Sequence, residues 1–421
     1  MSQQTFIPFC RLEIDEDEIS EVVSTLRSGW LTTGARTAQF ETEFQNYVGS
    51  RHALAVNSGT AALHLALASL GIGPGDEVIT TPLTFCATVN VILHVGATPV
   101  LADIGSDGNI DPASIASRIT ERTRAVIPVH FAGAPCDMDA IWSLAKEYEL
   151  FVVEDAAHAA GTLYRGKHVG AACFPSDAVA FSFYATKNLT TGEGGMVTTN
   201  RETLASRIKM LTLHGISKDA WNRYGEEGTW YYEVIENGFK YNLTDIQSAI
   251  GIHQLRKLER FVQQRTRYAE IYTRAFGDLE ELEIPEAATN GRHSWHLYVL
   301  RLNLDLLTID RARFISELRS RKIGASVHFI PIFRHPFFKE WASLPQNQCP
   351  RCSEVYPRLI SLPLHPFMKE EEVHYIATAV QEIVMKFRKT RVLPIRQFAA
   401  GSDTARALSE GIGRAAEGSP R

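Results

Sequence analysis

The sequence lacks long hydrophobic runs, a strong charge of either sign and a set of paired cysteines. No run of about 18 apolar residues is present, so we predict no membrane-spanning helix. The formal net charge is −5, which gives no reason to expect nucleic-acid binding. The N-terminus has neither the basic region nor the apolar stretch of a secretion signal. Six mostly scattered cysteines indicate free thiols in a reducing compartment, so we expect a cytoplasmic protein.

Patterns that bind metals are also sparse. Cys349 and Cys352 have the spacing of half a zinc site or of a redox motif, but no second pair lies nearby. A redox motif of this kind stands at a strand-to-helix junction, whereas these cysteines follow a segment rich in Gln, Asn and Pro. We therefore expect two exposed loop thiols. His293 and His296, with His328 further on, lack a third close ligand, so no metal site is predicted.

The composition is that of a soluble globular protein, and 421 residues allow two or three domains. Short apolar segments predict strands, and helical patterns separate several of them. This alternation predicts an α/β fold with a mainly parallel, doubly wound sheet, in which ligands bind beyond the carboxyl ends of the strands. The strands predicted for this sheet are 52–56, 77–80, 99–102, 125–129, 151–155, 179–183 and 196–199. Two more strands are predicted in the C-terminal part of the chain, at 296–302 and 325–329.

Two charged side chains follow two of these strands. Asp155 ends one of them, and Lys187 lies a few residues beyond another, flanked by the hydroxyls of Ser182 and Thr186. A lysine in a polar loop is ordinarily just solvated. A lysine that forms a Schiff base with pyridoxal phosphate (PLP), however, needs a carboxylate at the pyridine nitrogen, and hydroxyls and backbone N–H groups for the phosphate. Asp155 and Lys187 fit that requirement.

The segment 57–60 (NSGT) joins a predicted strand to a predicted helix at 61–70. Small polar residues there leave free N–H groups at the positive end of the helix, which suits an anion. Simple capping of the helix by Ser58 explains the segment equally well. The glycine-rich segment 71–75 closes a helix instead of opening one, so it predicts a turn and no dinucleotide site.

Five segments, in this order along the chain, resemble the DegT/DnrJ/EryC1/StrS family of PLP-dependent sugar aminotransferases. They are 30–34 (WLTTG), 57–63 (NSGTAAL), 154–158 (EDAAH), 182–195 (SFYATKNLTTGEGG) and 238–242 (GFKYN).

The resemblance implies PLP fold type I, the aspartate aminotransferase-like fold, with a doubly wound sheet in a large domain and a smaller α+β C-terminal domain. The expected divisions are an N-terminal arm with a substrate-mouth loop (1–50), a large PLP-binding domain (51–255), a small domain (256–389) and a flexible tail (390–421).

The resemblance also implies roles for individual residues. Lys187 and Asp155 are the catalytic pair, with Asp155 at the ring nitrogen of the cofactor. The remaining cofactor-binding residues are Gly59, Thr60 and Ser182 at the phosphate, Phe85 stacked on the ring, His158 against the phenolic oxygen, and Asn242.

Asn242 is expected to reach the phosphate bound to a partner subunit, which implies a homodimer with shared active sites. The residues alone leave another interpretation open, because Asn242 could equally be the N-cap of the helix predicted from Thr244. The residues expected near the substrate are Thr33, Gly34 and His328.

The expected reaction moves an amino group from an amino acid, L-glutamate, to the C4 keto group of a nucleotide-linked keto-deoxy sugar, with a UDP-sugar favoured. Such a reaction serves amino-sugar synthesis for lipopolysaccharide or other glycans. A keto-cyclitol or 3-keto-sugar transaminase stays open as an alternative. A non-catalytic regulatory protein on the same fold would predict loss of Lys187 or Asp155, and a sugar dehydratase would carry histidine in place of Lys187; the sequence retains both residues.

Overall fold

The structure, a computed structural model, describes residues 5–216, 231–286, 288, 290–339 and 346–390. The tail expected at 390–421 therefore falls almost wholly outside the described residues.

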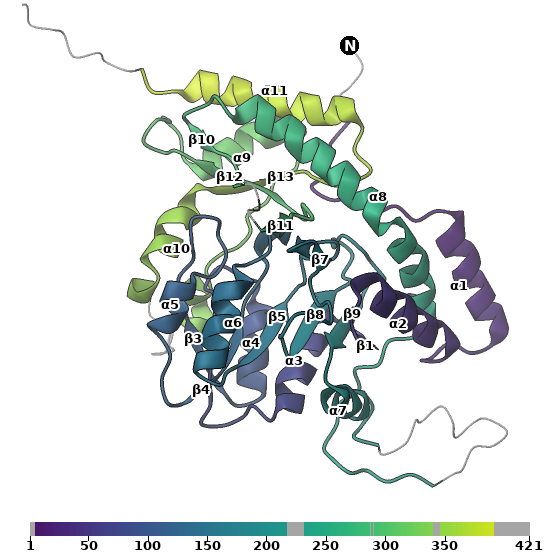
Figure 1. Cartoon of the computed structure of the whole chain (residues 1–421). Helices are drawn as coiled ribbons and strands as arrows, with labels where there is room; N and C mark the ends of the chain where they lie inside the picture. The colour runs from purple at the N-terminus through teal and green to yellow at the C-terminus, as the bar shows by residue number, and fades with distance from the viewer. Residues whose placement is uncertain (1–4, 217–230, 287, 289, 340–345, 391–421) are drawn as a thin grey trace, which may run out of the picture. The chain divides into compact units, whose positions relative to one another are not determined.

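A central sheet of seven strands has the order β1-β9-β8-β5-β4-β2-β3 (Figure 1). The strands β3, β2, β4, β5 and β8 are parallel to their neighbours in this run, while β9 is antiparallel to both β8 and β1. The α/β, mainly parallel sheet predicted from the sequence is confirmed, with every strand predicted for this sheet present to within two residues at each end. The strands are β1 (His52–Val56), β2 (Glu77–Thr80), β3 (Thr98–Leu101), β4 (Thr123–Ile127), β5 (Phe151–Asp155), β8 (Ala178–Ser182) and β9 (Gly195–Thr199).

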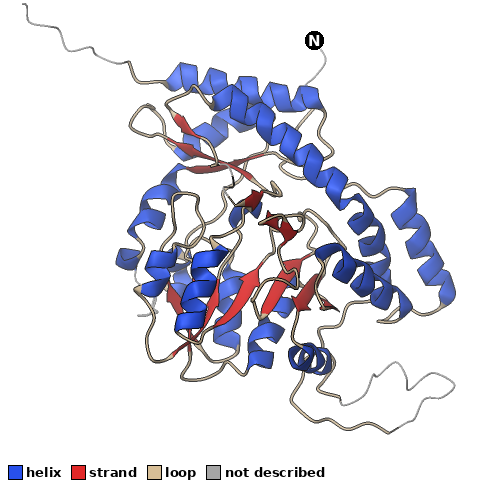
Figure 2. Cartoon of the chain, viewed as in Figure 1, coloured by secondary structure: helices blue, strands red, loops and turns tan. Residues whose placement is uncertain are grey.

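Helices bury both faces of this sheet, as Figure 2 shows in blue and red. Because side chains alternate along a strand, Ala178 and Ala180 of β8 pack with one set of helices, and Val179 and Phe181 pack with another. Burial on both faces explains why these strands are almost continuously apolar. The first set is α3 (Gly59–Leu70), α4 (Cys86–His94) and α7 (Glu202–Thr212); α2 (Ala35–Val48), the first half of α8 (Asp245–Phe276), α5 (Pro112–Ala116) and α6 (Met138–Glu147) lie on the other face.

A smaller antiparallel sheet, β10-β12-β13, is covered by the second half of α8 and by α9 and α11 (Figure 1). The strand predicted at 325–329 is wrong, because only Ser326 makes an isolated bridge, to Ser361 of the edge strand. The elements are β10 (Leu282–Glu283), β12 (Tyr298–Leu302), β13 (Leu359–Leu362), α9 (Arg311–Ser320) and α11 (Glu370–Phe387); a third small sheet holds β6 (Leu163–Tyr164), β7 (Lys167–His168) and β11 (Gly291–Arg292).

The long helix α8 is capped as its sequence predicts. Thr244 and Gln247 form a capping box, in which the Thr244 hydroxyl accepts from the Gln247 amide and the Gln247 side chain accepts from the Thr244 amide. Asn242 is therefore not the N-cap, and that interpretation of it is wrong. α8 joins the two larger sheets, since its first half packs under the central sheet and its second half under the smaller one.

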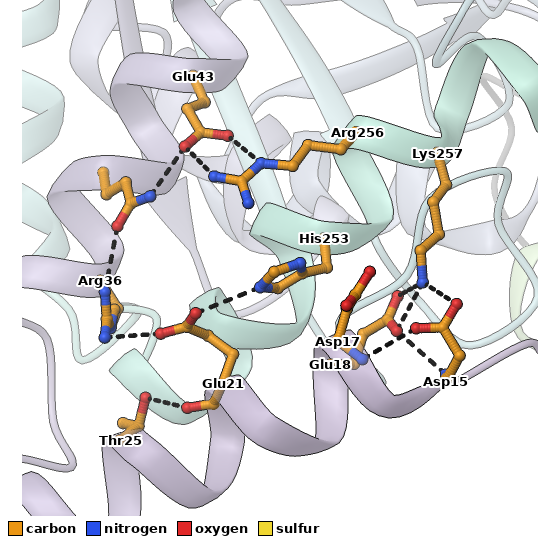
Figure 3. Close-up of polar contacts among 11 residues, drawn as sticks. Asp15, Asp17, Glu18, Glu21, Thr25, Arg36, Glu43, His253, Arg256 and Lys257 are labelled. Atoms are coloured by element: carbon orange, nitrogen blue, oxygen red, sulfur yellow. Dashed lines mark hydrogen bonds and ion pairs between the residues drawn. The ribbon is translucent and has the colours of Figure 1, made fainter.

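The N-terminal arm is fixed to α8 by ion pairs, shown in Figure 3. Glu18 of α1 (Glu16–Ser28) is fully buried, and its Oε2 lies 2.8 Å from the ammonium of Lys257, which also pairs with Asp15. A buried carboxylate is tolerated only with such a partner, so the pairing holds the arm in one position. Further pairs join Glu21 to Arg36 and His253, and Glu43 to Arg256.

The two cysteines of the C-x-x-C pair are buried, so the expectation of exposed loop thiols is wrong. Cys349 is the N-cap of α10 (Pro350–Val355), and Asp103 accepts hydrogen bonds from the amides of Arg351 and Cys352 at 2.8 and 3.0 Å. Burial raises the pKa of Cys349 to about 12, so its thiol is protonated and unreactive near neutral pH.

In the part of the chain described, no cluster of three or more His, Cys, Asp or Glu side chains forms a metal site. Among the same residues, no helix has the length and apolar character required to span a membrane.

Candidate active site

A cavity of about 650 Å³ opens beyond the carboxyl ends of β5 and β8. Strands of a doubly wound sheet deliver side chains to this edge from distant parts of the sequence. The cavity brings together eight of the residues predicted from the sequence: Gly59, Thr60, Phe85, Asp155, His158, Ser182, Lys187 and His328.

Lys187 lies in the turn after β8, where its amide donates to the carbonyl of Tyr184 at 2.9 Å. Desolvation by the surrounding protein lowers the pKa of its amine to about 8, although the carboxylate of Asp155 acts in the opposite direction. A sizeable fraction of Lys187 is therefore a neutral, nucleophilic amine near neutral pH.

We expect the chemical reactivity of Lys187 in the cofactor-free protein to rise with pH around a midpoint near 8, in place of the ordinary 10.5. Asp155→Asn should move the midpoint lower still, because the Asp155 carboxylate favours the protonated amine. Labelling with an amine-reactive reagent, quantified by mass spectrometry for each lysine peptide, measures both values. Lys146, exposed on α6, is the internal control for the reagent. A midpoint at or above 10 would contradict the burial of this amine.

Asp155 is the last residue of β5 and is buried. Its Oδ2 accepts from the Thr88 hydroxyl at 2.8 Å and its Oδ1 accepts from the Ala157 amide at 3.1 Å. Burial raises the pKa of this carboxyl, while the two hydrogen bonds and Lys187 favour its anionic form. Asp155 thus offers a fixed acceptor to a cationic N–H group in the cavity.

An anion cradle forms where α3 begins. The Ser58 hydroxyl accepts from the Ala61 amide at 3.0 Å, so the capping interpretation is confirmed. Capping satisfies only one donor of the first turn, and the amides of Gly59 and Thr60 have no partner within the helix. A Cβ on Gly59 would lie 2.8 Å from the Cβ of Ser182, so only glycine allows α3 to approach β8 this closely.

Three neutral histidines form another wall of the cavity. The rings of His158 and His296 lie 4.3 Å apart, and His158 also stacks on Phe329 at 5.6 Å. Burial lowers the pKa of His158 well below its ordinary value and that of His328 to about 4. Nδ1 of His158 is buried and has no hydrogen-bond partner among the described residues. These rings can donate or accept hydrogen bonds without adding charge near Lys187.

Phe85 stands at the edge of the cavity just before α4. It is 60% exposed, and its ring centre lies 6.2 Å from that of Phe329. The sequence did not identify Phe329, Thr88, Arg265 or His296 as members of the site, although all four line the same cavity. Tertiary packing brings each of these four residues to the cavity, so no local sequence motif indicates that it belongs to the site.

Thr33, Gly34 and Asn242 lie elsewhere. They line a separate cavity of about 770 Å³ beside α2 and the start of α8. The side-chain amide of Asn242 donates to the Thr33 hydroxyl at 2.7 Å, and the backbone amide of Gly34 donates to Asp245 Oδ1 at 2.7 Å. Within one chain, these residues do not contribute to the cavity that contains Lys187.

The residues around the first cavity fit PLP. Asp155 matches a protonated pyridine nitrogen, the start of α3 matches a phosphate, and the unpartnered Nδ1 of His158 adds a polar atom to the same wall. The aldehyde of the cofactor would meet an amine of lowered pKa, that of Lys187. Together with the doubly wound sheet, this donor set defines the class: a PLP-dependent enzyme of fold type I.

The chain belongs to the DegT/DnrJ/EryC1/StrS aminotransferase family, whose model matches residues 12–381. It is a sugar aminotransferase of this family. The resemblance stated from the five sequence segments is thereby confirmed.

Known relatives match almost the whole chain. The spore coat polysaccharide biosynthesis protein SpsC of Bacillus subtilis is 49% identical over 381 residues, which cover 90% of this chain and 97% of SpsC. Spr1654 of Streptococcus pneumoniae, solved in PMP and PLP forms, is 34% identical in the PMP form with a TM-score of 0.83, covering 90% of this chain and 99% of that one. PseC of Helicobacter pylori, an aminotransferase involved in the biosynthesis of pseudoaminic acid, is 32% identical with a TM-score of 0.83, covering 91% and 100%.

Proposed function

We propose that this sugar aminotransferase moves an amino group from L-glutamate to the C4 keto group of a nucleotide-linked keto-deoxy sugar, with a UDP-linked sugar favoured. The observation that carries the proposal is the placement of Lys187 and Asp155 in one cavity of about 650 Å³, together with an anion cradle. The names of SpsC and PseC, which refer to polysaccharide and pseudoaminic acid synthesis, support a glycan precursor as the acceptor. Lipopolysaccharide or glycan synthesis in the cytoplasm stays a prediction.

Lys187 and Asp155 carry the chemistry. When bound, PLP supplies an electrophilic carbon and a ring that accepts electrons. The Lys187 amine would hold the cofactor, and as a free base it would take the proton from the α-carbon of the donor. The Asp155 carboxylate holds the proton on the ring nitrogen, and Thr88 and the Ala157 amide fix that carboxylate in place.

The other residues position these groups. The amides of Gly59 and Thr60 and the hydroxyls of Thr60 and Ser182 bind the phosphate at the start of α3. His158 would face the phenolic oxygen of the cofactor, and Phe85 would cover one face of its ring. His328, whose Nδ1 pairs with the Ser361 hydroxyl at 2.8 Å, presents its other edge to the acceptor.

We further propose a homodimer with shared active sites, in which Asn242 completes the phosphate site of the partner. The support is that Asn242, Thr33 and Gly34 line a cavity of their own and not the one around Lys187. Mixing Lys187→Ala with Asn242→Ala protein should therefore restore activity, because each mixed dimer contains one intact site. With random subunit exchange, the activity should recover to roughly a quarter of the wild-type value. No recovery after verified exchange, or a monomer in solution, would contradict shared sites.

The acceptor is tested with a panel of UDP-, dTDP- and GDP-linked 3-keto and 4-keto sugars and a keto-cyclitol, each with glutamate. We expect release of 2-oxoglutarate with a UDP-linked 4-keto sugar at a kcat/KM above that of every other acceptor. The highest value with the keto-cyclitol or a 3-keto sugar would establish the corresponding alternative.

A further inference from the structure

Arg265, on α8, has no assigned role and lines the same cavity as Lys187. The residue is only 3% exposed, and no described residue forms an ion pair with it. One end of the guanidinium, Nη1, donates to main-chain carbonyls in the cavity wall: that of Leu364 at 2.6 Å and those of Trp295 and His296 at 3.2 Å. These three contacts fix the guanidinium in place without neutralising it.

The remaining donors of Arg265 lack acceptors. Its Nε is buried, and no described residue accepts a hydrogen bond from Nε or from Nη2. Burial lowers the pKa of Arg265 only to about 10, so the side chain is a cation at neutral pH. The neighbouring Cys10 does not supply a negative charge, because burial raises the pKa of its thiol. A buried cation without a counter-ion is unfavourable, so an anion is expected to complete this site.

The donors proposed for the cofactor phosphate are in another part of the cavity wall. Those donors are at the start of α3, packed against Ser182 of β8. Arg265 instead donates to the carbonyl of His296, whose ring lies 4.3 Å from that of His158. The guanidinium therefore belongs to the histidine wall, and a second anion must be its partner. The keto end of a sugar acceptor is uncharged, whereas an amino-acid donor brings a carboxylate to the reacting carbon.

We propose that Arg265 binds a carboxylate of the amino donor and so restricts the donor to amino acids. This inference rests on the proposed function, in which an amino acid supplies the nitrogen. A guanidinium is suited to the task, because its planar N–H groups match the geometry of a carboxylate and its charge is permanent. The anchoring by three carbonyls means that little freedom is lost when the carboxylate binds.

The test compares Arg265→Met and Arg265→Lys with a matched control, Arg267→Met. Arg267 lies on the same helix, but its side chain is 61% exposed and pairs with Glu370. The measurements are the dissociation constant of 2-oxoglutarate from the cofactor-loaded protein by calorimetry, the KM for glutamate, the dissociation constant of UDP, and the reaction rate with benzylamine, an amine that has no carboxylate.

We expect Arg265→Met to weaken 2-oxoglutarate binding and raise the KM for glutamate by about 10- to 100-fold, the value of a charged hydrogen-bonded contact. Arg265→Lys should show a smaller loss, since it keeps the charge and loses the planar fork. UDP binding, the rate with benzylamine and every property of Arg267→Met should stay within about twofold of wild type.

Several results would overturn the inference. Unchanged 2-oxoglutarate binding in Arg265→Met means that the donor carboxylate does not contact Arg265. Selective loss of UDP binding assigns the cation to the nucleotide diphosphate instead. An equal loss of reaction rate with glutamate and with benzylamine means that Arg265 only stabilises the structure of the cavity wall. Should Arg265→Met fail to fold, unchanged binding in Arg265→Lys leads to the same conclusion. A wild-type protein that binds 2-oxoglutarate but aminates no nucleotide sugar contradicts the proposed acceptor and leaves this inference standing.

Discussion

Lys187→Ala is expected to abolish transamination and to remove the visible absorbance of the cofactor-loaded protein. The loss in kcat should be on the order of 10³-fold or more, because one side chain is both the attachment point and the group that moves the proton. Lys187 is the lysine of the active-site cavity, and its lowered pKa makes it reactive near neutral pH. Absorbance spectra and 2-oxoglutarate release from glutamate measure the two effects.

Two further variants make this result specific. Lys187→Arg keeps a cation but provides no neutral amine, so it should be as inactive as the alanine variant. Lys146→Ala changes an exposed lysine of α6 and should behave as wild type. A Lys187→Ala protein that folds, retains the visible band and turns over glutamate would show that another amine holds the cofactor.

Asp155→Asn should lower kcat by roughly 10²- to 10³-fold, the cost of removing one fixed electrostatic partner from a catalytic site. The substitution preserves the shape of the side chain. Its single oxygen can still accept from the Ala157 amide, and its NH2 group can donate to the Thr88 hydroxyl, so the fold should survive. What is lost is the negative charge that holds a proton on the ring nitrogen. Cofactor affinity should fall with kcat, because the substitution would remove the charge proposed to pair with the ring nitrogen.

The matched control for Asp155→Asn is Thr88→Val, which removes the hydroxyl that donates to Asp155 Oδ2 but leaves the charge. We expect its loss in kcat to be about tenfold or less, the value of one neutral hydrogen bond. Steady-state kinetics with glutamate and titration of the cofactor measure both variants. Wild-type kcat in Asp155→Asn would mean that the ring nitrogen has no need of this carboxylate.

Much of the fold followed from local patterns in the sequence. The strands of the central sheet are buried on both faces, so each appears as a short apolar run, and both His52–Val56 and Phe151–Asp155 match their predicted bounds. The capping box at Thr244 and Gln247 marked the start of α8 because it is a contact between near neighbours. Interactions of this range can be recognised in a single sequence.

The predictions that were wrong concern contacts between segments far apart in the sequence. The segment 325–329 has the composition of a strand, yet among the described residues its backbone forms a bridge to the edge strand β13 at Ser326 alone. Cys349 and Cys352 follow a polar segment, but Asp103, far away in the sequence, accepts from the start of their helix and helps bury them. No local pattern encodes such a partner.

The site divides in the same way. Lys187 and Asp155 could be identified because each follows an apolar strand, and strands of one sheet end at a common edge. Arg265 could not be identified, since its place in the cavity depends on the course of α8 and on the carbonyls of two separate loops. Asn242 was assigned by resemblance alone, and its distance from the Lys187 cavity within one chain leaves its role to the dimer experiment.

PLP is expected to be attached covalently to Lys187. Reducing the cofactor-loaded protein with borohydride makes that bond permanent, and peptide mass spectrometry then locates the modified residue. We expect a single pyridoxyl phosphate adduct, on Lys187, and we expect glutamate added before the reductant to prevent it. An adduct on another lysine, or a fully loaded protein with no adduct at Lys187, would contradict it.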